Sequence, residues 1–62
     1  MRYNVSYEMN NVYQNCLVET DHDLQENKDL IAQRLRITVD KVFGIKIATP
    51  DDERPGKPVI NI

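Results

Sequence analysis

The sequence is poor in the residues on which catalytic and metal sites depend. Its 62 residues include one cysteine (Cys16), one histidine (His22) and no tryptophan. A single cysteine excludes an intrachain disulfide and the paired thiols of a zinc site. His22 has no matched nucleophile, and the sequence contains no G-x-S-x-G, C-x-x-C or glycine-rich phosphate loop. We therefore expect a protein that is not an enzyme and that binds no cofactor or metal.

Long apolar runs and an excess of basic residues are also missing. No stretch approaches the roughly 20 apolar residues that span a bilayer, and the first residues lack the apolar segment of a secretory signal. Together with the single thiol, which suits a reducing compartment, this predicts a cytoplasmic protein without a membrane partner. Ten acidic and eight basic side chains give a net charge of −2, which argues against nucleic acid as the partner.

What the sequence does contain is a strand pair that specifies its own register. Apolar and polar side chains alternate on both sides of Asn10-Asn11, and asparagine tolerates the positive φ angles that a type I′ turn requires. In that hairpin Val5 lies opposite Cys16. One face is then almost wholly apolar and the other mostly polar, and a slip of one residue would mix the two sets.

A helix and a third strand follow the predicted hairpin. Asp23 is a good N-cap for a helix over residues 24–36, and Glu26 completes a D-x-x-E form of the capping box. Residues 42–48 alternate again and predict the third strand. Its apolar set, which should face the helix, is Phe43, Ile45 and Ile47.

This order of elements predicts a two-layer α+β domain over residues 1–49. The expected fold is β-β-α-β, with a three-stranded antiparallel sheet of order 2-1-3 and one helix packed on one face. Residues 50–62 contain three prolines and an acidic run, so we expect a flexible C-terminal tail. Its apolar end, 58–62, is suited to forming a strand at a sheet edge.

The second face of this predicted sheet has no covering layer, and two of its three strands are edges. Because so short a chain has a thin stability margin, we expect it to associate with a protein partner or with itself as a homo-oligomer. The predicted interaction surface consists of Tyr13, Leu17, Leu30, Val42 and Lys46.

An acidic patch is predicted around the start of the helix. Its members are Asp21, Asp23, Glu26 and Asp29. Counted from Asp21, an EF-hand loop would need glycine at the sixth position and glutamate at the twelfth, where this sequence has Glu26 and Ala32. Helix capping accounts for these carboxylates without a metal ion, so we expect none.

The segments RYNVSYE, DLQENKDLIAQRL and ITVDKVFGIKI together resemble, at the level of fold, small β-β-α-β proteins of bacterial and phage genomes. The resemblance transfers no functional residue. The sequence predicts a small non-catalytic protein-interaction module, of the kind found as phage or prophage accessory proteins. Two alternatives stay open: weak nucleic-acid binding through the second face, and acidic inhibition of a nucleic-acid-binding protein.

Overall fold

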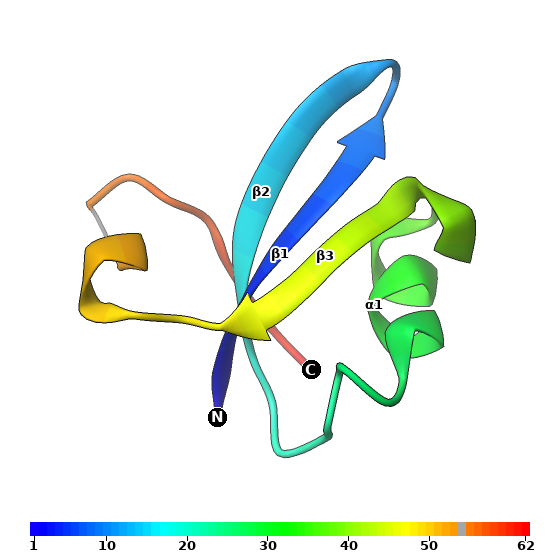
Figure 1. Cartoon of the computed structure of the whole chain (residues 1–62). Coiled ribbons are helices and arrows are strands. Elements are labelled where there is room, and N and C mark those ends of the chain that lie inside the picture. The colour runs from blue at the N-terminus through cyan, green and yellow to red at the C-terminus, as the bar shows by residue number, and fades with distance from the viewer. Residues whose placement is uncertain (54) are drawn as a thin grey trace.

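The computed structural model describes residues 1–53 and 55–62 (Figure 1). Within these residues the chain forms a mixed four-stranded sheet of order β3-β1-β2-β4 and one α-helix. The elements are β1 (Arg2–Met9), β2 (Val12–Glu19), α1 (Lys28–Leu35), β3 (Val42–Ile47) and β4 (Val59–Asn61), with 3-10 turns at Val39–Lys41 and Pro50–Asp52. The α+β class is as predicted. The predicted three-stranded antiparallel sheet of order 2-1-3 is corrected, because β4 adds a fourth strand parallel to β2.

The hairpin has the predicted register. Val5 lies opposite Cys16 along β1 and β2, and Asn10 and Asn11 have φ angles of 54° and 63°. These are the left-handed values that a type I′ turn needs at both positions. The alternation of apolar and polar residues and the Asn10-Asn11 turn therefore specify the same register.

The core lies between one face of this sheet and α1. Val5, Cys16, Val18, Leu24 and Ile31 are fully buried at its centre. The short helix contributes Ile31 and Ala32 as its buried residues, and it lies beside the sheet in Figure 1. In the part of the chain that the structure describes, no helix has the length and apolar character needed to cross a membrane.

The helix begins later than the sequence predicts. The Asp23 side chain accepts a hydrogen bond from the Gln25 N–H (3.1 Å) and so forms a turn two residues long, a local alternative to helix that aspartate favours. The Asn27 amide then donates to the Asp23 carbonyl (2.9 Å), and the helix starts at Lys28 with Asn27 as N-cap residue. The predicted capping box of Asp23 and Glu26 is therefore wrong.

An extra residue in β3 reverses two predicted side-chain positions. Gly44 lies opposite Ser6 but Val42 lies opposite Tyr7, so the register shifts and Phe43 is the additional residue. A bulge of this kind changes which side chains point to each face. Val42, predicted to lie on the interaction surface, is buried in the core, and Phe43, predicted to lie in the core, is 45% exposed.

The last residues lie beside β2 and cover the final part of its outer edge. β4 pairs with Leu17, Val18 and Glu19 of β2, within the segment 58–62 whose sequence is suited to a strand. The Leu17 N–H also donates to the Pro58 carbonyl (3.1 Å). The predicted domain limit at residue 49 and the flexibility of 50–62 stay predictions.

Candidate interaction surface

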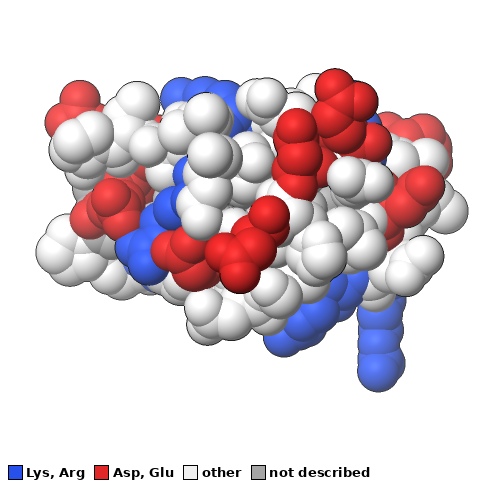
Figure 2. Space-filling view, turned by 90° about the horizontal axis from the view of Figure 1, so that it is seen from below, with Lys and Arg blue, Asp and Glu red and all other residues white. Residues whose placement is uncertain are grey.

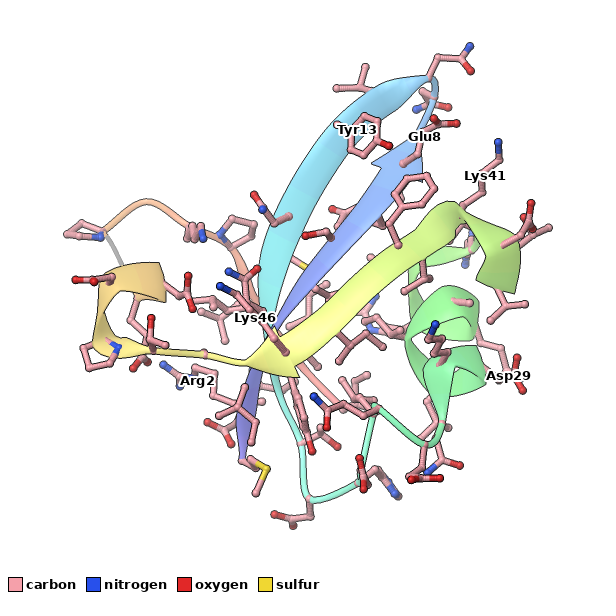
Figure 3. All side chains as sticks on the ribbon, viewed as in Figure 1. Arg2, Glu8, Tyr13, Asp29, Lys41 and Lys46 are labelled. Atoms are coloured by element: carbon pink, nitrogen blue, oxygen red, sulfur yellow. The ribbon has the colours of Figure 1, made fainter. Side chains whose placement is uncertain are left out.

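The five side chains predicted as one interaction surface lie in different environments. Leu17 is only 1% exposed and Val42 is buried, so both predictions are wrong. Leu30 is partly buried and packs against the core. Tyr13 and Lys46 are exposed, and Figure 3 shows both projecting from the sheet.

Tyr13 belongs to an aromatic pair that the sequence pattern did not reveal. Its ring stacks on that of Phe43, with centroids 5.0 Å apart and an angle of 28° between the planes. The rings come from β2 and β3, which lie on either side of β1. Phe43 reaches this position because of the bulge, for which a single sequence offers no reliable signal. We call Tyr13 and Phe43 the aromatic pair.

The surroundings of the aromatic pair are small and uncharged on the β2 side. A shallow hollow of about 210 Å³ is lined by Ser6, Tyr13, Gln14 and Asn15. Towards β3, Lys41 Nζ contacts the Glu8 carboxylate at 3.1 Å, and this contact raises the pKa of Lys41. Glu8 and Lys41, the charged residues beside the aromatic pair, therefore form an ion pair with each other.

The other half of the second face is occupied by the 3-10 turn Pro50–Asp52. The Asp52 carboxylate accepts hydrogen bonds from the Thr49 N–H (2.8 Å) and from the Asn4 amide (2.9 Å), and Lys46 Nζ lies 3.8 Å from it. The bond from the Thr49 backbone is the main reason why the pKa of Asp52 is lowered. This cluster joins the C-terminal segment to β1 and β3.

One further contact, between Arg2 and Glu53, joins the same segment to the start of β1. Arg2 contacts the carboxylates of Glu19 (3.2 Å) and Glu53. The hydrogen bond that Arg2 donates to the Glu53 carboxylate is the largest cause of the raised Arg2 pKa. The Arg2 guanidinium is therefore already paired with two acids.

The outer edge of β3 is available for pairing, as is the part of the β2 edge before Leu17 that β4 does not cover. Among the described residues, β3 pairs only with β1. The Ala48 N–H donates to the Arg2 carbonyl (2.9 Å). Because hydrogen-bonded and non-hydrogen-bonded pairs alternate along an antiparallel ladder, residues 44, 46 and 48 direct their backbone groups to β1. Ile45 and Ile47 direct theirs outward. Consistently, the outward carbonyl of Ile45 accepts a bond from Gln25 Nε2 (3.1 Å). Ile47, next along this edge, is 54% exposed.

The predicted acidic patch consists of exposed side chains, and Asp23 is the member already engaged in a local turn. Figure 2 shows acidic side chains in several groups with basic side chains between them, not as one continuous area. No three His, Cys, Asp or Glu side chains in the described part of the chain are placed to hold a metal ion. The patch therefore shows no arrangement beyond that of solvated carboxylates.

Cys16 lies in the core and not at a site. Its side chain is fully buried, and this burial raises the pKa of the thiol. Because the thiolate is the reactive form, this cysteine is in an unsuitable place for nucleophilic chemistry.

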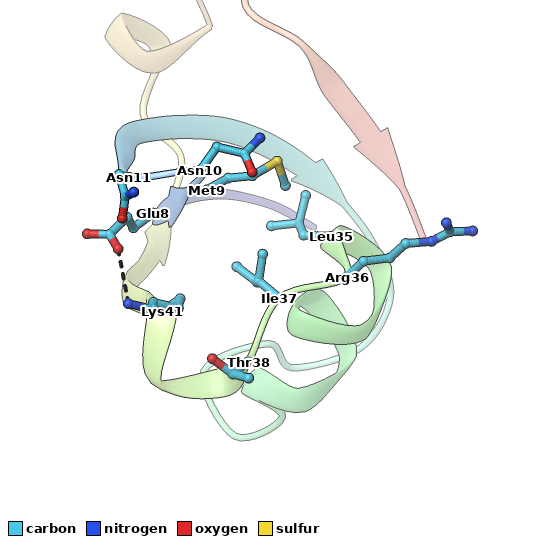
Figure 4. Close-up of a pocket in the computed structure, with 9 residues that line it drawn as sticks. All are labelled: Glu8, Met9, Asn10, Asn11, Leu35, Arg36, Ile37, Thr38 and Lys41. Atoms are coloured by element: carbon cyan, nitrogen blue, oxygen red, sulfur yellow. Dashed lines mark hydrogen bonds and ion pairs between the residues drawn. The ribbon is translucent and has the colours of Figure 1, made fainter.

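A cleft of about 510 Å³ lies between the hairpin turn and the end of α1 (Figure 4). Its floor is formed by Met9, Leu35 and Ile37, which pack against the core. The Glu8–Lys41 ion pair lies on one side. Arg36 also lines the cleft, which therefore combines an apolar floor with charged groups at its margin.

No protein-family model matches this sequence, and comparison with curated proteins and with solved structures finds no match.

Proposed function

We propose that this chain is a non-catalytic protein-interaction module that binds through the aromatic pair and the adjoining edge of β3. The observation that carries the proposal is the stacked Tyr13 and Phe43, of which Tyr13 is 72% exposed. Aromatic side chains are enriched at protein interfaces and supply much of the binding free energy there. The pair adjoins the outer edge of β3, which has no strand beside it among the described residues.

Protein is favoured over nucleic acid as the partner by the charges on this face. Arg2 is paired with Glu19 and Glu53, and Lys46 lies near Asp52. Single-stranded nucleic acid requires a positively charged groove beside its stacking aromatics. The aromatic pair has uncharged neighbours in the hollow of β2 instead.

The cytoplasm is the compartment that we propose for this activity. The support is Cys16, a free thiol enclosed in the core, which is typical of proteins in reducing compartments.

The proposal is tested by affinity capture from cells of the source organism with Tyr13→Ser and Phe43→Ser. Val12→Ser is the matched control, because Val12 is also exposed on β2 but is not part of the aromatic pair. We expect proteins retained by wild type and by Val12→Ser to bind at least tenfold more weakly to both aromatic variants. Thermal unfolding should change little, since the substituted side chains are exposed.

Equal capture by all four proteins would contradict the proposal. A titration with labelled single-stranded oligonucleotides at low salt separates the alternative. We expect no binding in that titration. Salt-dependent binding that is lost in Tyr13→Ser would instead identify nucleic acid as the partner of the aromatic pair.

A further inference from the structure

We propose that the partner at the β3 edge is a second copy of this chain, joined by antiparallel pairing of the two β3 strands. Ile45 would lie opposite the partner's Ile45, and Phe43 opposite the partner's Ile47. This inference rests on the proposed function and names the occupant of its strand edge. Four observations support it: the direction of the backbone groups, the contact with Gln25, the space above Gly44 and the position of Lys46.

The backbone N–H and C=O groups of β3 point in the directions that this pairing requires. Residues 44, 46 and 48 bond to β1, as the Ala48 to Arg2 bond shows. The N–H and C=O groups of Ile45 and Ile47 therefore face outward, where an antiparallel neighbour forms its hydrogen-bonded pairs. In the proposed register the outward residues of one strand meet the outward residues of the other. The regular overlap covers residues 44–46 of both strands, and Phe43 of each strand, at the bulge, lies opposite the partner's Ile47.

The structure already has a hydrogen-bond donor where the partner strand would supply one. Gln25 Nε2 donates to the Ile45 carbonyl, and the Gln25 side chain is exposed. The bond is made by a single flexible side chain, so a backbone N–H of a second strand can replace it without disturbing the core. The same replacement frees Gln25 to bond with water.

The side chains along the edge fit one another in this register. Gly44 lies opposite the partner's Lys46, and a Cβ added at Gly44 would meet no atom within 4 Å. The aliphatic part of each Lys46 can therefore pass over the partner's Gly44. Because Lys46 meets a glycine and not a cation, no like charges oppose each other within β3.

The outer edge of β3 has some, but not all, of the features that protect strand edges from pairing. Lys46 is the one charged residue of β3, and it lies on the second face near Asp52 and not along the outer edge. The protections present are Lys46 and the bulge at Phe43, whereas β3 contains no proline and no inward-pointing charge. Ile47 is instead exposed at this edge.

Pairing of this kind would join the two sheets into one. A two-fold axis perpendicular to the sheet keeps the second faces on the same side. The two aromatic pairs would then lie on one continuous surface, with the two Phe43 residues displaced by four strand positions, roughly 13 Å. The dimer would present two aromatic pairs to one partner protein.

The test is sedimentation of the full chain over a concentration series up to about 1 mM, at the weak end of the affinity scale. We expect the mass to rise from 7.2 kDa towards twice that value. Ile47→Pro removes an outward N–H and no bond to β1, so it should weaken association at least tenfold. Ile47→Ala keeps that N–H and is the matched control, expected to stay within a few-fold of wild type. Gln25→Ala removes the competing donor and should strengthen association.

A second measurement tests the inference even if the Ile47→Pro variant fails to fold. In a mixture of differently labelled copies, the proposed register predicts an intermolecular NMR contact between the Hα atoms of Gly44 and the partner's Lys46, a closely spaced pair. A monomer at every concentration overturns the inference. So does a dimer that shows a different intermolecular contact, or one that Ile47→Pro leaves unchanged.

These outcomes are separable from failure of the proposed function. A monomeric wild type whose capture of other proteins still depends on Tyr13 overturns the dimer alone. A monomeric wild type that captures no protein through the aromatic pair or the β3 edge overturns both.

Discussion

Leu17 shows how a single side chain can change its role when a distant segment pairs with its strand. The hairpin pattern places Leu17 on the polar face, opposite Asn4. In the structure Leu17 lies opposite Val59, and its N–H bonds to Pro58. The residue is therefore part of the buried interior and not of the contact surface.

Leu17→Ala should lower the free energy of unfolding by about 2–5 kcal/mol, because it removes a fully buried apolar side chain and leaves a cavity. Chemical denaturation followed by circular dichroism measures this change. Tyr13→Ala is the control on the same strand and should have a much smaller effect, since its ring is exposed. Equal losses for the two variants would contradict the described burial of Leu17.

Cys16 provides a second prediction at the residue scale. Because its side chain is fully buried and the pKa of its thiol is raised by that burial, labelling by an aromatic disulfide reagent should be slow in the folded protein. The rate should increase at least a hundredfold in denaturant. Rapid labelling under native conditions would show that the core opens or that the thiol is accessible.

At the scale of elements, the 3-10 turn Pro50–Asp52 links the C-terminal segment to the sheet through one carboxylate. Asp52 bonds to Thr49 and Asn4, and its pKa is lowered. A carboxyl group whose pKa is lower in the folded state stabilises the fold above its unfolded pKa. That contribution is lost as the pH falls through the lower, folded value.

We therefore expect the free energy of unfolding to decrease as the pH falls below the ordinary aspartate value of about 3.9. Asp52→Asn keeps the size of the side chain but has no charge to titrate, so its decrease over the same interval should be smaller. Denaturant titrations at several pH values measure both slopes. Glu19, whose pKa is also lowered, chiefly by its bond from the N-terminal amine, retains its own contribution in both proteins. Identical slopes would show that Asp52 does not carry the dependence.

The helix shows the limits of capping patterns at this scale. Asp23 and Glu26 have the spacing of a capping box, but the Asp23 side chain bonds to Gln25 and the helix begins four residues later than predicted. Leu24, predicted to lie on the buried stripe of the helix, is fully buried even so. Leu24 therefore lies in the core although its local conformation is not the predicted helix.

At the scale of the whole molecule, the C-terminal segment closes half of a sheet face and leaves the other half free. Asp52 contacts Asn4 of β1 and Pro58 contacts Leu17 of β2. Tyr13 and Phe43, nearer the hairpin turn, stack on each other without such cover. The candidate surface thus results from where the segment lies. Of the residues predicted for that surface, Tyr13 lies on it and Lys46 is exposed beside Asp52. Phe43 is the addition that sequence reasoning missed.

The sequence by itself determined the hairpin, its turn and the α+β class, because each depends on residues close together in the chain. Alternation around Asn10-Asn11 permits one register that keeps the apolar side chains on one face. The tertiary structure alone decided the parallel pairing of β4 with β2 and the bulge at Phe43. The first joins residues some forty positions apart, as Leu17 and Val59 show, and the second depends on how β3 fits against β1. Neither long-range fit is encoded in a local pattern, and together they separate the buried residues of the second face from those available for binding.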